Sequence, residues 1–255
     1  MADLDELVKK CRKSPVKMRP VLPMGQPLSV GMVGYLDQHA FRYLGSVETI
    51  LGEPTGKLLS GEGLPSVEVL SGKDVSISSY AKGQTSQAFG DFAKAKARVE
   101  LTFSSGKSFL IAAQDLRIKT MTEPHVLLAA MLRAYSIGLW RKHYCLIYQI
   151  AWASSFRAVL SHQPGAKLLL SLAGELGDGP ASLGSLAAKA SYERQSGQLE
   201  QLITNKSVPA FFNAYRIKDR FFSGSAVEVA ATVPAGSSLK DVQAALGRSN
   251  PFERV

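Results

Sequence analysis

The chain has 255 residues, 45% of them apolar and 20% charged, and its 30 Lys and Arg against 21 Asp and Glu give a net charge of +9. A chain of this length buries a core without disulfides, and two cysteines, Cys11 and Cys145, exclude a disulfide framework and any multi-cysteine zinc module. The positive charge favours an anionic partner: nucleic acid, an acidic protein surface or a membrane with anionic lipids.

The hydropathy pattern predicts no helix that spans a membrane. The longest apolar run, Val126 to Leu132, is about seven residues, whereas a spanning helix needs roughly 17–25. The first residues carry the acids Asp3, Asp5 and Glu6 where a signal peptide would begin its apolar stretch. We therefore expect a soluble protein made in the cytoplasm.

The N-terminal region is predicted to form a short helix that leads into the densest charge of the chain. Residues 3–11 place acids first and lysines last, which suits the helix dipole, and Pro15 and Pro20 prevent further helix. No acid interrupts the cations from residue 9 to residue 19. We call the six cations the basic cluster: Lys9, Lys10, Arg12, Lys13, Lys17 and Arg19.

Alternating or β-rich segments predict many strands. Residues 28–35 and 40–44 form two strands across a turn at Asp37, whereas the glycines and prolines of residues 52–66 indicate a loop. From Ala95 to Phe103 apolar and polar residues alternate strictly, and after a turn at residues 104–107 the chain returns as residues 108–113. Further strands are predicted at 67–70, 74–81, 144–160, 167–173, 186–193, 198–203, 208–217 and 226–233.

Two helices are predicted besides the first. Thr120 and Glu123 have the spacing of a capping box, Pro124 suits the first turn, and Gly138 is a good C-terminal stop for the apolar helix between them. A short helix is expected at residues 238–246. Many strands with few helices predict an α+β fold with a twisted, mostly antiparallel sheet.

Catalytic patterns are missing. The segment 52–58 lacks the glycine spacing and the Ser or Thr of a phosphate-binding loop, and His143 with Cys145 provides only two metal ligands. Asp74, Asp91 and Asp115 are isolated acids rather than a catalytic pair. We therefore predict a protein that is not an enzyme and that holds no metal or cofactor. Its aromatic residues are interpreted as sheet core, so nucleic acid is not expected as a partner.

The alternating strands allow a membrane role. Without a spanning helix, a soluble chain enters a bilayer only as strands of a closed barrel, with about 9–11 residues per strand. Residues 95–103 have this length and period, residues 74–81 could pair with them across the insertion 83–92, and residues 155–173 with 186–203 form a second candidate pair. The alternative is that these are half-buried strands of an ordinary sheet.

The order of elements resembles the N-terminal pore-forming domain of gasdermins, in their short bacterial or fungal form. The likeness covers roughly residues 3–217 and is carried by TEPHVLLAAMLRAYSIGLW with YCLIYQIAWASSFRAVLS (122–161) and by VPAFFNAYRI (208–217). The usual N-terminal phrase of bacterial members and a large C-terminal repressor domain are missing. The resemblance implies two hairpins that extend into a membrane β-barrel, a pore-forming domain over residues 1–225 and a regulatory tail over residues 226–255.

The resemblance also implies roles for residues. The basic cluster would bind anionic headgroups, and Cys11 within it would be the acylated cysteine of the bacterial members. Lys96, Arg98 and Lys107 would line the lumen or contact headgroups. The membrane-inserting strands would present Val75, Ile77, Val99, Leu101, Phe103, Val159, Leu168 and Leu170.

The function implied is permeabilisation of an anionic inner or plasma membrane by a homo-oligomeric ring, with cell death as a defence against viruses. A protease would activate the protein by cleavage near Pro234 to Ser238. The alternative from composition alone is a non-catalytic basic α+β module that binds an acidic protein or nucleic acid.

Overall fold

The computed structural model describes residues 3–64, 66–71, 74–79, 98–122, 124–171, 191–195, 199–204, 206–218 and 252–255. These residues form mostly antiparallel sheets with few helices, which confirms the predicted α+β class. The chain folds as two compact units, each built from three segments. Unit 1 comprises residues 1–20, 64–116 and 153–210, and unit 2 comprises residues 21–63, 117–152 and 211–255.

The described residues of unit 1 form one helix and two sheets. A five-stranded sheet has the order β13-β14-β11-β8-β5, and a three-stranded sheet has the order β12-β7-β6. Its elements are α1 (Leu4–Lys13), β1 (Arg19–Pro20), β5 (Ser66–Leu70), β6 (Val75–Ser79), β7 (Arg98–Phe103), β8 (Phe109–Gln114), β11 (Ser155–Ser161), β12 (Ala166–Ser171), β13 (Ser191–Gln195) and β14 (Leu199–Thr204).

Unit 2 is built around one long strand, β10. β10 pairs with β2 through Tyr144–Leu146 and with β9 through Gln149–Trp152, and the order continues as β15-β10-β2-β3. The other elements are β2 (Met32–Asp37), β3 (Ala40–Ser46), α2 (Val47–Leu51), β4 (Leu58–Glu62), β9 (Arg117–Met121), α4 (Pro124–Ser136), β10 (Tyr144–Ala153), β15 (Val208–Ile217, mostly in this unit) and β16 (Phe252–Arg254).

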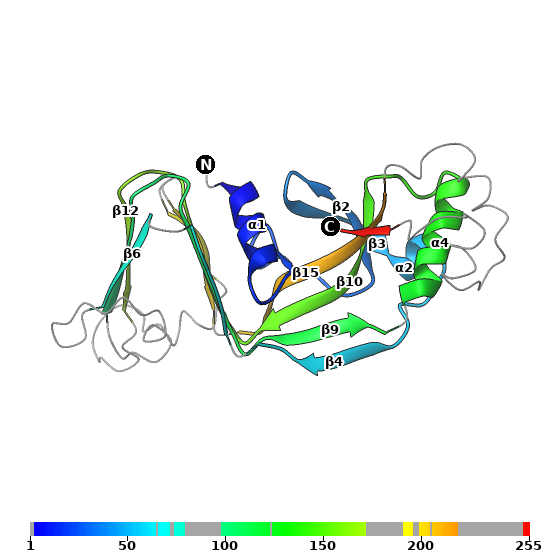
Figure 1. Ribbon diagram of the computed structural model, residues 1–255, viewed down its shortest axis with the longest axis horizontal. Coiled ribbons are helices and arrows are strands. Elements are labelled where there is room, and N and C mark those ends of the chain that lie inside the picture. The colour runs from blue at the N-terminus through cyan, green and yellow to red at the C-terminus, as the bar shows by residue number, and fades with distance from the viewer. Residues whose placement is uncertain are drawn as a thin grey trace. The chain divides into compact units, whose positions relative to one another are not determined.

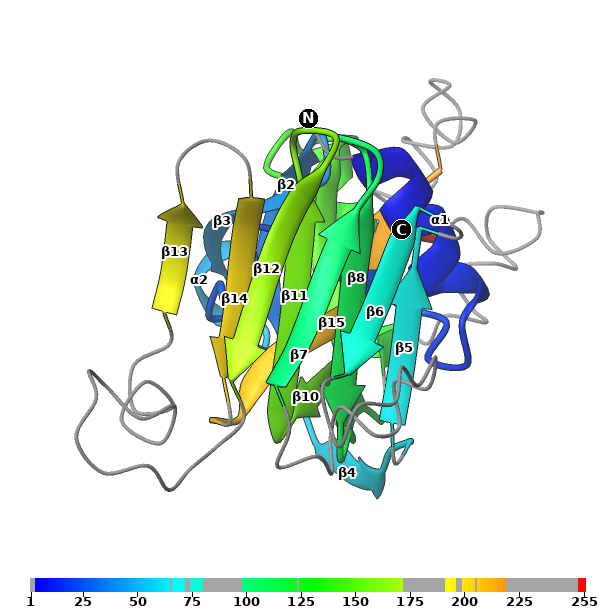
Figure 2. The same cartoon turned by 90° about the vertical axis from the view of Figure 1, so that its left-hand side faces the viewer.

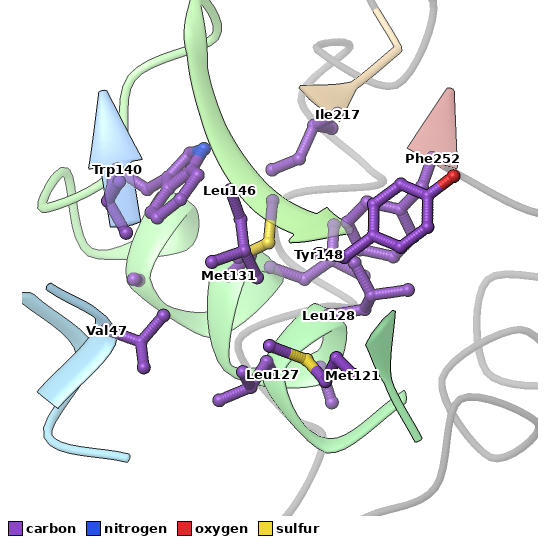
Figure 3. Close-up of a cluster of buried hydrophobic side chains, with 14 residues drawn as sticks. Val47, Met121, Leu127, Leu128, Met131, Trp140, Leu146, Tyr148, Ile217 and Phe252 are labelled. Atoms are coloured by element: carbon purple, nitrogen blue, oxygen red, sulfur yellow. The ribbon is translucent and has the colours of Figure 1, made fainter. Parts of the chain in front are cut away.

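One buried apolar cluster of unit 2 lies between its sheet and α4, and a second contains Phe41, Ile147 and Phe212. Figure 3 shows Met131 and Leu128 of α4 packed with Leu146 of β10 and with Phe252, from the last strand of the chain. Each of these four side chains is at most 4% exposed. The nearly all-apolar α4 is buried because side chains of both sheet and loops surround it. Among the described residues, no helix is both long and apolar enough to cross a membrane.

Several sequence predictions are confirmed. Asp3 caps α1 by accepting a hydrogen bond from the backbone N–H of Glu6 at 2.9 Å, and α1 runs two residues further than predicted. The hairpin of β2 and β3 turns after Asp37, with Gln38 at a φ of 54°. Gly138, at a φ of 79°, ends α4 as expected. The strand predicted at 208–217 is β15.

Other predictions are wrong, and each for a tertiary reason. Residues 58–62, expected in a loop, form the strand β4, because β9 supplies hydrogen-bond partners that override the glycines nearby. Thr120 is not a helix cap, since it lies in β9 opposite Gln149. The single strand predicted over 144–160 is two strands, β10 and β11, which separate at Ser154 and belong to different sheets.

Candidate functional site

The two sheets of unit 1 are joined at one bend, where three strands pass from one sheet to the other. β5 continues into β6, β8 is preceded by β7, and β11 continues into β12 (Figures 1 and 2). Figure 1 shows the green and yellow-green chains passing over the top of this bend. We call the bend the crease, and its described residues are 71, 74, 104–108 and 162–165.

The sequence predicted a different pairing here. The sequence predicts that residues 95–103 and 108–113 pair with each other across the turn at 104–107. In the structure β7 pairs with β6 and β12, whereas β8 pairs with β5 and β11. The turn residues are as expected, but a turn signal cannot distinguish a hairpin from a bend between two sheets. The predicted pairing of residues 74–81 with 95–103 is present as the ladder of β6 and β7.

Hydrogen bonds between neighbouring chains continue through the crease. The backbone N–H of Ser161 donates to Ser108 O at 2.8 Å, and that of Gly165 donates to Phe103 O at 2.7 Å. On the other side Ser104 N–H donates to Asp74 O at 2.9 Å. The chains therefore stay side by side while they bend.

The register between β7–β8 and β11–β12 is the same on both sides of the crease, whereas the register between β5–β6 and β7–β8 shifts by two residues there, from Leu70 opposite Leu110 to Val75 opposite Phe103. Phe103 lies opposite Ala166 in one sheet, and Phe109 lies opposite Leu160 in the other. The two bends between these pairs, 104–108 and 161–165, have equal lengths. Because neither chain has an extra residue, β7–β8 and β11–β12 have the register that two straight, continuous antiparallel strands would have.

The register also divides the three-stranded sheet into an apolar and a polar face. Leu101 and Phe103 are fully buried, and Ala166 is 4% exposed. On the opposite face Ser76 and Lys167 are exposed, and they flank Thr102. The sheet is therefore amphipathic with a period of two along β6 and β7, whereas β12 also places Leu169 on the polar face, opposite Glu100.

Seven of the eight residues proposed to face lipid occupy positions on this one apolar face. Val75, Phe103 and Ala166 are opposite one another, and Ile77, Leu101 and Leu168 form the next row. Val99 and Leu170 form a third row, with Ser79 as their neighbour. The eighth residue, Val159, belongs to β11 of the five-stranded sheet.

Two of the three residues proposed for the lumen or headgroups are described, one on the polar face and one in the crease. Arg98 is opposite Ser171 on the polar face, and Lys107 is an exposed residue of the crease. Lys96 lies outside the described residues. The roles of all three stay predictions.

Helix α1 packs against the five-stranded sheet, on the face away from the three-stranded sheet (Figure 1). Leu7 and Cys11 are fully buried there. The Lys10 ammonium donates to Leu70 O at 2.8 Å, pairs with Glu6 at 3.1 Å and lies 5.8 Å from the centre of the Phe109 ring. Leu70 ends β5 and Phe109 begins β8, so Lys10 holds α1 to the edge of the crease.

The six cations of the basic cluster therefore differ in their surroundings: two are bound or buried, and four are exposed. Lys10 is bound within unit 1, and Arg19 is only 8% exposed. The other four cations are exposed: Lys9, Arg12, Lys13 and Lys17. These four are available to an anionic surface while α1 stays docked.

The Cys11 thiol lies beneath the cluster rather than on its surface. Burial raises the pKa of this thiol to about 12. Since the thiolate is the reactive form, only about one molecule in 10⁴ carries it at pH 8. Acylation of Cys11 would require α1 to leave the sheet.

We expect Cys11 to resist a water-soluble maleimide at pH 8 for hours and to react when α1 is displaced. The measurement is the mass of the labelled peptide, with and without anionic vesicles. Cys145, which is 1% exposed in unit 2, is the internal control for general unfolding. Rapid labelling of Cys11 alone in the absence of vesicles would show that α1 is not docked as described.

Sequence reasoning missed two charged residues in the five-stranded sheet. Glu68 and Arg157 lie in the same row, on either side of Ala112. Desolvation by burial raises the pKa of Glu68 and lowers the pKa of Arg157. Each has an apolar residue on either side of it in the sequence, and a charge in such a short β-rich segment is the signal that could have identified them.

Among the described residues, no group of three or more His, Cys, Asp and Glu side chains is arranged to hold a metal ion. No known protein family and no curated protein matches the sequence. Among solved structures, the chain is similar to a bacterial gasdermin from Bradyrhizobium tropiciagri, with 14% identity and a TM-score of 0.33 over 79% of this chain and 82% of that chain. The fold class stated above depends on the strand pairings themselves.

Proposed function

We propose that this protein permeabilises membranes that contain anionic lipids, and that β6, β7 and β12 are the strands that enter the bilayer. The observation that carries the proposal is the amphipathic three-stranded sheet, two of whose strands, β7 and β12, continue through the crease into β8 and β11 of the second sheet in matching register. A strand that lies between lipid and a water-filled lumen needs one apolar face toward the lipid and one polar face toward the water.

In the proposed mechanism the crease opens and the three-stranded sheet swings away from the five-stranded sheet. The ladder between β7–β8 and β11–β12 needs no change of register for this movement. A crossing strand has about 9–11 residues, more than the six of β7, and the alternation of the sequence continues upstream to Ala95. Lys96 and Arg98 would then face the lumen, and the polar residues of the crease with Lys107 would lie at the headgroups.

The exposed part of the basic cluster would bring the protein to the membrane before insertion. Each cation near an anionic bilayer contributes about 1 kcal/mol to binding. Several copies of the chain would then close the wall, because an open sheet edge cannot remain in lipid. In a cell this activity would move the protein from the cytoplasm to the inner or plasma membrane and kill the cell, as a defence.

The chain's last residues provide a place for regulation. Phe252 is 3% exposed in the core of unit 2, and the Glu253 carboxylate pairs with the Arg216 guanidinium. A protease that removes the tail would take β16 from the edge of β15. The boundary predicted near residue 225 and the cleavage region 234–238 lie outside the described residues and stay predictions.

Dye release from phosphatidylglycerol-containing vesicles tests the proposal. We expect full-length protein, or protein ending at residue 225, to release the dye, and vesicles of neutral lipid to stay sealed. No release by either form from anionic vesicles would contradict the proposal.

The exposed cations of α1 also fit the alternative, a module that binds an acidic protein or nucleic acid. Salt-sensitive binding to single-stranded or duplex nucleic acid, without binding to vesicles, would favour this alternative. The amphipathic sheet at the crease has no role in it.

A further inference from the structure

A second surface, far from α1 in the sequence, combines exposed apolar side chains with cations. Among the described residues, Ile137 is 69% exposed and Leu139 is 60% exposed, and both immediately follow α4. Arg141, Lys142 and His143 come next and are exposed as well. We call residues 137–143 the tip loop.

The tip loop is held in place by backbone hydrogen bonds. Gly138 adopts a φ of 79°, and its N–H donates to Tyr135 O at 3.0 Å. The N–H groups of Leu139 and Trp140 both donate to Ala134 O, at 2.9 and 3.0 Å. These hydrogen bonds form a C-terminal turn of a helix with a left-handed glycine. Because they fix the backbone of the tip loop, Ile137 and Leu139 are exposed in a defined conformation.

Trp140 anchors the tip loop in the core of unit 2. Its side chain is 1% exposed and lies among the buried side chains shown in Figure 3. It contacts the Tyr144 ring edge-on, with ring centres 5.8 Å apart. A helix end of this kind commonly folds the apolar residue after the glycine back onto the helix. Here the buried residue is Trp140, and Leu139 is directed to solvent instead.

The charged side chains of the tip loop and of the sequence on either side of it have one sign, and Asp37, at the end of the neighbouring strand β2, is paired with Arg42 at 3.1 Å. The sequence has no Asp or Glu from Pro124 to Gly174. The one ion pair described at the end of α4 joins Arg133 to Glu53 at 3.4 Å, and it leaves Arg141 and Lys142 exposed. Two large apolar side chains beside exposed cations match the boundary of an anionic bilayer, where apolar groups enter the acyl chains and cations remain at the headgroups.

We propose that the tip loop is a membrane-contact site of unit 2, with Ile137 and Leu139 inserted between acyl chains and Arg141 and Lys142 bound to anionic headgroups. The occupant is a lipid surface, and the proposal rests on the proposed function. It assigns a partner to a surface that is separate from the basic cluster. His143 lies against the Tyr35 and Tyr144 rings and supports the loop from the side.

A fluorescent label at residue 139 tests insertion directly. Leu139→Cys provides an exposed thiol, and Leu59→Cys on β4 is a matched control, because Leu59 is 63% exposed. Both natural cysteines are buried, so labelling before vesicles are added modifies the introduced thiol. With a nitrobenzoxadiazole label and phosphatidylglycerol vesicles, we expect a rise of about threefold in emission at residue 139 and little change at residue 59, since the label brightens in an apolar medium. Equal behaviour of the two labels would overturn the proposal.

Two further variants separate the apolar and the ionic contributions. Ile137→Asn with Leu139→Asn is expected to weaken vesicle binding about tenfold at any salt concentration. Arg141→Glu with Lys142→Glu is expected to weaken it at least about 25-fold in low salt and much less in 1 M salt. Arg117→Glu with Lys119→Glu, two exposed cations of β9, is the control for net charge.

Sedimentation with vesicles and dye release are measured separately, so the two proposals can fail separately. Binding that depends on the tip loop without dye release supports the membrane contact and contradicts pore formation. The membrane contact is overturned if the wild type releases the dye and both tip-loop variants bind vesicles and release the dye as well as the wild type does. That result would leave pore formation in place. A wild-type protein that does not sediment with anionic vesicles overturns both.

Discussion

Replacing Lys9, Arg12, Lys13 and Lys17 together by glutamine is expected to weaken binding to anionic vesicles several hundredfold, about fivefold for each cation. All four side chains are exposed, so their removal leaves the packing of α1 intact. Lys10 is retained because its ammonium holds α1 to Leu70 O and to Glu6. Sedimentation with phosphatidylglycerol vesicles in low salt measures the effect, and the fold-change should shrink in 1 M salt, where the Debye length is about 3 Å.

The matched control removes four exposed cations elsewhere. Lys57, Arg117, Lys119 and Lys206 are all exposed and lie outside α1, so their replacement by glutamine lowers the net charge equally. We expect this control to bind at most about fivefold more weakly than the wild type, through long-range attraction alone. Equal losses in the two variants would mean that net charge, rather than the face of α1, drives the binding.

Substituting Gly106 and Gly165, the two glycines among the described residues of the crease, is expected to increase the rate of dye release at least about tenfold. Gly165 has a φ of 76°, where alanine costs about 1–2 kcal/mol. A Cβ at Gly106 would lie 2.9 Å from His162 O and 3.1 Å from the Gln163 Cα and N. Both costs apply to the bent form only, because a straight strand has negative φ values and normal spacing between cross-strand neighbours. Gly106→Ala with Gly165→Ala should therefore favour opening, and stopped-flow dye release measures it.

A glycine with the same strain outside the crease is the control. Gly56 has a φ of 79°, and like Gly165 it has no atom within 4 Å of an added Cβ. Gly56→Ala should cost a similar free energy of unfolding, measured by urea denaturation, without faster dye release. Equal acceleration by Gly56→Ala would show that general destabilisation, and not opening of the crease, limits the release.

Local patterns in the sequence predicted the elements of unit 1 but not their partners. The alternation of residues 98–103 identified a strand with one apolar face, and that face exists in the three-stranded sheet. Which strand lies beside it depends on contacts between residues 20 to 73 positions apart, and neither alternation nor turn chemistry encodes those contacts. For this reason the sequence predicts a hairpin at residues 104–107, where the structure has a bend between two sheets.

The sequence likewise does not predict which residues of the basic cluster are buried. The charge density from Lys9 to Arg19 is visible in the sequence, but the burial of Cys11 and Arg19 follows from the packing of α1 on the sheet. The tip loop was also missed, because Ile137 and Leu139 continue the apolar pattern of α4. Only the left-handed turn at Gly138 and the burial of Trp140 direct them to solvent.

The distance between residues 66 and 76 tests the opening of the crease most directly. Ser66 of β5 and Ser76 of β6 are exposed, so Ser66→Cys with Ser76→Cys accepts two spin labels. In solution we expect a separation of about 15 Å, from sheets stacked about 10 Å apart, and in phosphatidylglycerol vesicles about 33 Å, from ten residues of continuous strand. Ser76→Cys with Thr102→Cys, which are opposite each other in one ladder, should keep one distance in both. An unchanged 66–76 distance in vesicles that have released their dye would contradict insertion through an opened crease.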